Sequence, residues 1–148
     1  TDFTTEGILD TATTLGGAEA GAFDQAITKT DPAMVMMSLA TYQSIDPNNP
    51  AVFSSTIIDG HIRNALKYTG VVISDSMSAE ALSSYDVSQL GVKLVEAGGD
   101  MSCIGQTDYV KPIVDGLNER AKSDPAFASK VTAAATRVMA LKIKMGLA

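Results

Sequence analysis

The residues that could do chemistry centre on one carboxylate, Asp75. It follows Val71–Ser74, a run that predicts a short strand buried on both faces, as in the inner strands of parallel sheets. In such folds, ligands and reacting groups lie at the carboxyl ends of strands. Aspartate also caps loops and helix starts in most proteins, so spacing alone favours a structural role for Asp75.

Other side chains of interest are few. Met77 comes two residues after Asp75, and Tyr42 lies in the loop that follows another apolar run. Cys103 is typical of a small core residue, and His61, in the middle of a predicted helix, of a side chain at a packing boundary. One histidine and one cysteine cannot build a zinc site of the ordinary type, and no glycine-rich phosphate loop is present. We therefore expect neither a metal nor a cofactor.

Composition and charge exclude several classes of protein. The chain has 148 residues, of which 45% are hydrophobic and 19% charged, a balance typical of a soluble globular domain. Its formal net charge of -6 argues against nucleic acid as a partner, because phosphate binding needs a basic surface. No run approaches the roughly 18 apolar residues of a membrane helix, so we expect no membrane span. The single cysteine leaves the compartment open between secreted, cell-envelope and cytoplasmic.

The apolar pattern predicts the elements that position Asp75. We expect three strands, near residues 33–38, 71–75 and 100–104. Amphipathic stripes and capping residues predict helices over residues 17–29, 54–69, 86–98, 110–122 and 124–146. Residues 1–16 predict a loop or an incomplete element, and residues 78–85 a loop. Strand separations of about 30 to 37 residues match βαβ units, so the strands should be parallel with helices outside.

Three parallel strands make a poor domain by themselves. They leave two open edges and one apolar face, which we expect to carry side chains such as Val35, Val72 and Ile104. A closed (β/α)8 barrel takes about 250 residues. We therefore expect another chain or segment to cover this surface.

A series of motifs along the chain resembles glycoside hydrolase family 3, above all its single-barrel β-N-acetylglucosaminidases. In chain order the motifs are Met34–Ser38, Tyr42, Ile45-Asp46-Pro47, Pro50–Ser54, Ile62-Arg63, Gly70–Asp75, Ala97–Met101, and Arg137–Lys142 with Gly146-Leu147. They span nearly the whole chain, in the order and spacing of that family.

The resemblance implies an α/β fold in which residues 1–148 form the C-terminal part of a TIM-type (β/α)8 barrel. This part holds about three parallel strands with outer helices and begins after about the fifth strand of the barrel. The Lys-His-Phe-Pro-Gly motif of the family is absent, and Thr1–Phe3 resembles the chain that follows it. We therefore expect a fragment, a processed product or one piece of a two-chain assembly. Its partner would be the N-terminal half of the barrel or a second copy of the chain.

The resemblance also implies a retaining β-glycosidase that acts on β-linked N-acetylglucosamine or glucose. The nucleophile of the family is the aspartate of a Ser-Asp pair at the end of a strand, and it falls on Asp75. Met77 could then line the sugar pocket, and Tyr42 could stack on a sugar or bond to it. The isolated chain should be inactive, because the residues with which the family grips its sugar lie upstream.

The remaining carboxylates are harder to assign. The N-acetylglucosaminidase branch of the family takes its proton donor from an Asp-His pair, but residues 1–16 hold Asp2, Glu6 and Asp10 and no histidine. Asp2 or Glu6 could substitute, although an exposed loop acid is far more often merely solvated. We expect Asp46 mainly to shape a turn and Asp100 to cap or pair.

Two rival hypotheses remain open. The chain could be a degenerate, non-catalytic member of the same fold that binds sugar or serves structurally, a hypothesis that the missing Asp-His pair favours. It could also be an unrelated doubly wound α/β domain of flavodoxin-like size. The second rival is weakened by its strand count, since three strands are predicted and that fold needs five.

Overall fold

Parallel strands and helices alternate along the chain in the computed structural model, which describes residues 3–148. The strands are β1 (Leu9–Asp10), β2 (Met34–Met37), β3 (Thr41–Tyr42), β4 (Val71–Ser76) and β5 (Met101–Cys103). The long helices are α1 (Ala18–Thr30), η2 (Thr56–Ala65), α2 (Val87–Ala97), α3 (Val110–Ser123) and α4 (Pro125–Lys144). Short 3₁₀ turns complete the order: η1 (Ala51–Phe53), η3 (Glu80–Leu82) and η4 (Thr107–Tyr109).

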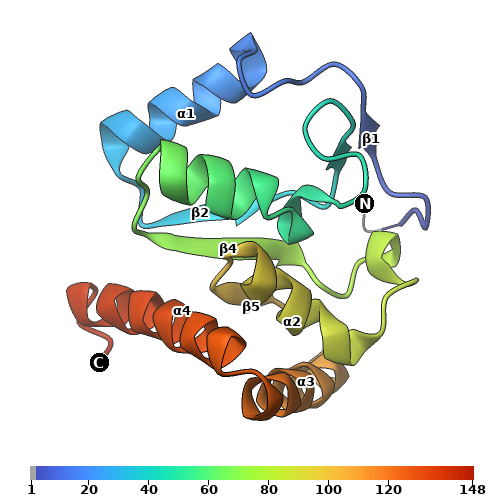
Figure 1. Ribbon diagram of the computed structural model, residues 1–148, viewed down its shortest axis with the longest axis vertical. Coiled ribbons are helices and arrows are strands. Elements are labelled where there is room, and N and C mark those ends of the chain that lie inside the picture. Colours follow the sequence, from blue (N-terminus) through green and yellow to red (C-terminus); the bar gives the residue numbers. More distant parts are fainter. Residues whose placement is uncertain (1–2) are drawn as a thin grey trace.

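The main sheet has three parallel strands in the order β2-β4-β5. Met34 lies opposite Val71, and Ile73 lies opposite Met101. In Figure 1 the strands run side by side through the middle of the molecule, with α1 and η2 along β2 and β4 and with α2, α3 and α4 towards β5. The prediction of three parallel strands with outer helices is therefore confirmed.

A second, smaller sheet was not predicted. β1 pairs in parallel with β3, so that Leu9 lies opposite Thr41 and Asp10 opposite Tyr42. Residues 1–16 were expected to form a loop or an incomplete element; residues 9 and 10 form this short strand, and the rest of the described part of that segment is irregular. Two-residue strands carry too little alternation to show in a sequence pattern.

The helices cover the opposite face of the sheet from the one predicted. Val35 and Val72 pack into the core against the outer helices, and Ile104 packs beside them. The open face instead carries Met34 and Met36, which are 45% and 61% exposed. The expectation that Val35, Val72 and Ile104 lie on the face awaiting a cover is therefore wrong. Neighbouring residues of a strand point to opposite faces of the sheet. If one residue is assigned to the wrong face, all the other residues of that strand are assigned to the wrong face as well.

Helix η2 is wound more widely than an α-helix. The amide of Gly60 bonds to the carbonyl of Ser55, and that of Leu66 to the carbonyl of His61, both at 2.9 Å and both five residues back. Ile58 and Ile62 are buried on its inner face, whereas Ala65 is exposed. The wider winding turns Ala65 towards solvent.

Local signals at the helix ends behave as predicted. Asp86 caps α2 by accepting the amide of Ser88 at 2.8 Å, and Asp124 caps α4 by accepting the amide of Ala126 at 2.9 Å. Helices α2 and α3 approach closely at Gly116, where an added Cβ would lie 1.9 Å from the carbonyl oxygen of Ser88. This glycine therefore sets the spacing of the helices that cover β5.

Candidate functional site

Asp75 lies near the carboxyl end of β4, the central strand of the sheet. Its side chain is half-buried. Oδ1 accepts the backbone amide of Ser76 at 2.7 Å, and within residues 3–148 no hydrogen bond is found to Oδ2. The backbone therefore holds one of the two carboxylate oxygens.

The pairing of β4 with β5 is irregular at this point. Ile73 lies opposite Met101 and Ser76 opposite Cys103, so β4 advances three residues while β5 advances two. The extra residue makes a β-bulge at Ser74 and Asp75. Bulges occur next to active sites, where they re-aim a side chain. The strand therefore presents Asp75 at an angle that a regular ladder would not give.

Serine hydroxyls tie the loops beyond this bulge together. Ser78 Oγ lies 3.2 Å from Ser76 Oγ and accepts the amide of Gly105, also at 3.2 Å. The amide of Met77 donates to the carbonyl of Cys103 at 2.9 Å. The Cys103 side chain is exposed, so the expectation of a small core residue there is wrong. Because β5 is the outermost described strand of its sheet, no neighbouring strand covers it.

The two predicted sugar-contacting residues lie apart from Asp75. Met77 is fully buried in the main core, so its side chain offers no surface to a sugar, and we assign it to the core instead of a pocket wall. Tyr42 is half-buried in β3 and lines a groove of about 400 Å³ beside β2. Asp75 is not among the residues that line this groove.

The groove lies between α1, the edge of β2 and η2. Its wall includes Phe23 and Ile27 from α1 and Met36 from β2, and it is mostly apolar. His61 Nε2 reaches Asp24 Oδ1 at 2.8 Å across the groove, from η2 to α1. His61 therefore joins two helices of the outer layer, as expected of a side chain at a packing boundary.

The acids near the start of the chain give no clear proton donor. Asp10 accepts three hydrogen bonds, from the amides of Ala12 and Thr13 at 2.9 and 2.7 Å and from the hydroxyl of Thr13 at 2.9 Å. The bonds from Thr13, followed by that from Ala12, hold the pKa of Asp10 below its usual value. Glu6 is exposed, and Asp2 lies outside the described residues.

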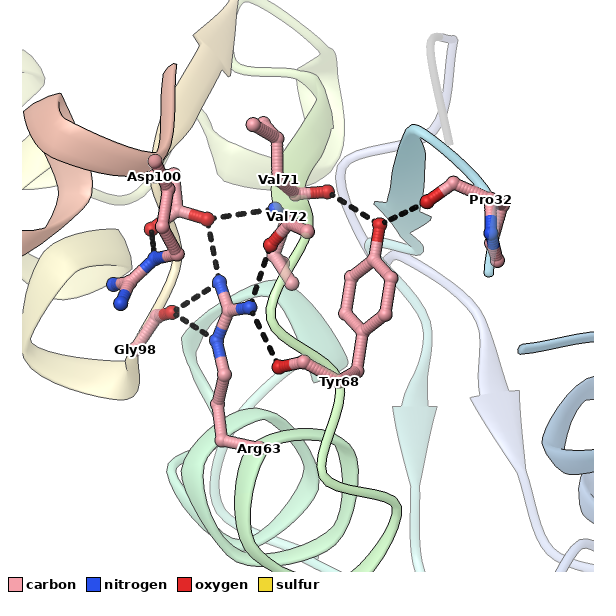
Figure 2. Close-up of polar contacts among 9 residues, drawn as sticks. Pro32, Arg63, Tyr68, Val71, Val72, Gly98 and Asp100 are labelled. Carbon is pink, nitrogen blue, oxygen red and sulfur yellow. Dashed lines mark hydrogen bonds and ion pairs between the residues drawn. The ribbon is translucent and has the colours of Figure 1, made fainter. Parts of the chain in front are cut away.

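Asp100 is the centre of a buried ionic network at the opposite end of the strands from Asp75. Its side chain has no exposed surface and bonds to the guanidinium groups of Arg63 and Arg137 and to the amide of Val72. Figure 2 shows that the guanidinium group of Arg63 contacts Asp100, the carbonyl of Gly98 and the backbone just before β4. The prediction that Asp100 pairs is confirmed, and so is the turn role of Asp46, which accepts the amide of Asn48.

Two residues in this region were not singled out from the sequence. Arg137 of α4 donates to Asp100 Oδ1 at 2.8 Å and so joins the last helix to the base of the sheet. Ser74 is fully buried, and its hydroxyl accepts the amide of Cys103 at 2.9 Å. A serine directly after the apolar run Val71–Ile73, within the predicted strand, is a usable signal, because a buried hydroxyl needs a partner.

The described residues hold neither a metal-binding cluster nor a membrane-spanning helix. Across residues 3–148, no three side chains of His, Cys, Asp or Glu gather closely enough to hold a metal ion. In the same part of the chain, no helix has the length and apolarity needed to cross a membrane.

The fold and site define a class of α/β protein, in which helices flank parallel strands and a carboxylate lies at the carboxyl end of the central strand. Residues 7–141 match the family model described as the glycosyl hydrolase family 3 N terminal domain. The chain therefore belongs to glycoside hydrolase family 3, and its strands and helices are part of the TIM-barrel-like domain of that family.

Solved structures agree with this assignment. The β-N-acetylhexosaminidase of Beutenbergia cavernae superposes with a TM-score of 0.87 at 35% identity, over 95% of this chain and 42% of its own. A family 3 β-N-acetylglucosaminidase from Paenibacillus gives a TM-score of 0.84 at 25% identity, over 97% of this chain and 28% of its own. A curated relative from Arthroderma benhamiae, named as an uncharacterized secreted glycosyl hydrolase, is 36% identical over 69 residues, 46% of this chain and 20% of that protein. The chain thus spans less than half the length of each of these relatives.

Proposed function

We propose that Asp75 is the nucleophile of a retaining β-glycosidase. The observation that carries the proposal is its position: a half-exposed carboxylate at the carboxyl end of the central strand, with one oxygen held by the Ser76 amide. In a parallel α/β barrel this end is where substrates bind. Membership of family 3 supports glycoside hydrolysis as the reaction. The free oxygen attacks the anomeric carbon while a general acid, contributed outside the residues assigned here, protonates the leaving oxygen as the glycosidic bond breaks. Water then hydrolyses the glycosyl-enzyme and restores the carboxylate.

The proposed substrate is a glycoside of β-linked N-acetylglucosamine or glucose. The similar structures named above are a β-N-acetylhexosaminidase and a β-N-acetylglucosaminidase, which favours the amino sugar. A role for Tyr42 in contacting the sugar stays a prediction. Because Tyr42 lies in a groove that Asp75 does not line, such a contact would be at a distance from the reacting carbon.

A second candidate function is binding without turnover. Retaining hydrolysis needs an acid that is protonated at working pH. Asp10 is the best-ordered carboxylate near the start of the chain, but its three hydrogen bonds favour the charged form. It is therefore poorly suited to donate a proton. This observation supports a degenerate member that keeps the fold and a sugar site but lacks rapid catalysis.

The proposal includes a partner that completes the barrel, either the N-terminal half or a second copy of the chain. β2 and β5 are the outermost described strands of the sheet, and both are free to pair further. Met34 and Met36 are exposed on the open face. We call this chain together with the part that supplies the other strands the complete barrel, and we expect the isolated chain to be inactive. Sedimentation that shows a stable monomer with protected strand amides would argue against a partner.

The test of the nucleophile is Asp75→Asn in the complete barrel. The substitution hardly changes volume, so the fold should persist. Losing the covalent route should cost several orders of magnitude in rate, on the order of 5 kcal/mol of barrier or more. The matched control is Asp46→Asn, since Asp46 shapes a turn and should affect mainly stability.

Trapping with a 2-fluoro or dinitrophenyl β-glycoside, followed by peptide mapping, locates the attacked residue. We expect the label within residues 71–77. A label elsewhere, or near-normal turnover by Asp75→Asn, would show that another residue attacks. If the unlabelled wild type binds N-acetylglucosamine in calorimetry yet turns over no aryl glycoside, the binding function is correct instead.

A further inference from the structure

The backbone that carries Asp75 is anchored on both sides by a single residue of the next strand, Cys103. Before Asp75, the hydroxyl of Ser74 accepts the Cys103 amide at 2.9 Å. After it, the amide of Met77 donates to the Cys103 carbonyl, also at 2.9 Å. Both hydrogen-bonding groups of one β5 residue are thus satisfied by the segment that brackets Asp75.

The first of these anchors is a side chain in place of a backbone carbonyl. The bulge puts four β4 residues, Ile73 to Ser76, opposite three in β5, Met101 to Cys103, so the regular ladder is broken between them. The hydrogen bond of the Cys103 amide is half-buried, and an amide shielded from water is costly without an acceptor. Ser74 Oγ supplies the acceptor at the point where the ladder cannot, and this contact holds the bulge closed.

Ser74 also lies within the core and not at its solvent-exposed edge. It is fully buried, and the backbone on its other side lies opposite Met37 in the β2 ladder. One described serine shares this burial: Ser54, which is also fully buried and accepts one backbone amide, that of Ile57, at 3.2 Å. Ser54 lies at the start of η2 and not on the strand that carries Asp75. It is therefore a matched reference for what a buried hydroxyl does for the fold alone.

We propose that Ser74 is a positioning residue for the nucleophile: its hydroxyl fixes the bulge and thereby the direction in which Asp75 leaves the strand. The inference rests on the proposed function of Asp75. Loss of the hydroxyl frees the Cys103 amide and lets the strand relax towards a regular ladder. Because attack needs the carboxylate oxygen aligned with the anomeric carbon, a displacement near 1 Å can cost about 100-fold in rate.

The experiment compares Ser74→Ala with Ser54→Ala in the complete barrel, using inactivation by a 2-fluoro β-glycoside. This reaction reports attack by the nucleophile without the later hydrolysis step. We expect the maximal inactivation rate to fall about 10- to 100-fold for Ser74→Ala, with the inhibitor concentration for half-maximal rate changed less than about threefold. Ser54→Ala should keep the wild-type rate within about twofold. Circular dichroism at the assay temperature confirms that both variants are folded.

A second measurement does not depend on activity or on the variant's folding. Amide hydrogen exchange in the wild type should show Cys103 protected to the same degree as the ladder amide of Ile73. If Ser74→Ala folds, its Cys103 amide should exchange faster while that of Ile73 does not change. A Cys103 amide that exchanges freely in the wild type would overturn the inference even if Ser74→Ala fails to fold.

The outcomes separate the two proposals. If the wild type is labelled at Asp75 and Ser74→Ala is inactivated as fast as Ser54→Ala, the positioning role is wrong and the nucleophile stands. If the wild type is not labelled at Asp75, the proposed function is wrong, and the positioning role is overturned with it. Equal losses in both serine variants would show only a shared effect on stability, which contradicts the positioning role.

Discussion

Replacing Asp100 by asparagine should destabilise the protein more than replacing any other described acid. The carboxylate is fully buried and meets two guanidinium groups, those of Arg63 and Arg137, besides the amide of Val72. The side chain of Arg63 is only 11% exposed, whereas that of Arg137 is 29% exposed and can turn towards water. Asp100→Asn keeps an oxygen for the Val72 amide but leaves the Arg63 charge buried without a counter-ion.

The size of the effect follows from these contacts. Hydrogen bonds to charged groups contribute about 1.5–3 kcal/mol each. The asparagine oxygen in the place of Oδ2 still accepts from Val72 and Arg63, but the bond from Arg137 to Oδ1 is lost and the bond from Arg63 no longer joins opposite charges. Removing one partner of a buried ion pair costs about 3–5 kcal/mol, which agrees with the loss expected from the hydrogen bonds. Arg63 keeps its bonds to the carbonyls of Tyr68, Gly70 and Gly98, which argues for the lower end of that range. We therefore expect a loss of about 3–4 kcal/mol.

Urea unfolding followed by far-ultraviolet circular dichroism measures this loss. With a denaturant dependence of about 2 kcal/mol per molar, the midpoint should fall by about 1.5–2 M. Asp46→Asn is the control, because Asp46 accepts from the neutral donors Asn48, Asn49 and Ser54, with no buried guanidinium, and should cost about 1 kcal/mol. A double variant with Arg63→Met should lose less than the sum of the single losses, because it removes the stranded charge. Equal midpoints for Asp100→Asn and Asp46→Asn would refute the reasoning.

Two further predictions concern packing and the phenol of Tyr68. Gly116→Ala should lower the stability by about 2 kcal/mol or more, because its Cβ would meet the backbone of Ser88. Gly21→Ala, where an added Cβ has nothing within 4 Å, should raise the stability by about 0.5–1 kcal/mol. Thermal unfolding of the two variants checks both signs. Tyr68→Phe removes the donor to the carbonyl of Pro32 and should cost about 1–2 kcal/mol at neutral pH, measured by urea unfolding. Burial raises the pKa of Tyr68, so its contribution is complete below about pH 10 and is lost as pH rises through the raised value. Stability of the wild type should therefore fall more steeply above pH 10 than that of Tyr68→Phe, and parallel curves would contradict the assignment.

The parts of the fold that depend on neighbouring residues in the sequence were predictable. Asp86 and Asp124 cap their helices by reaching amides two residues on, and such contacts need no knowledge of the rest of the chain. The same holds for the position of Asp75, since the apolar run before it defines where β4 ends.

Features set by contacts between distant segments were not predictable. Val35 and Met36 are both apolar, so nothing in their order says which one faces the helices. The bulge at Ser74 depends on where β5 pairs, and Met77 is buried by the core that forms around it. The wide winding that exposes Ala65 has no pattern of its own in the sequence.

The register of the sheet also governs the order in which the protein can fold. Met34 can pair with Val71, and Ile73 with Met101, only after the intervening chain, which includes a complete helix, has folded back on the sheet. Closing such loops costs entropy before any ladder bond is gained, which makes parallel sheets slow to assemble. Helices α3 and α4 follow one another in the chain, so their contacts can form without any strand pairing. Until β2 and β4 join, their edges are exposed to other unfolded chains, so the slow step of folding is also the step most open to aggregation.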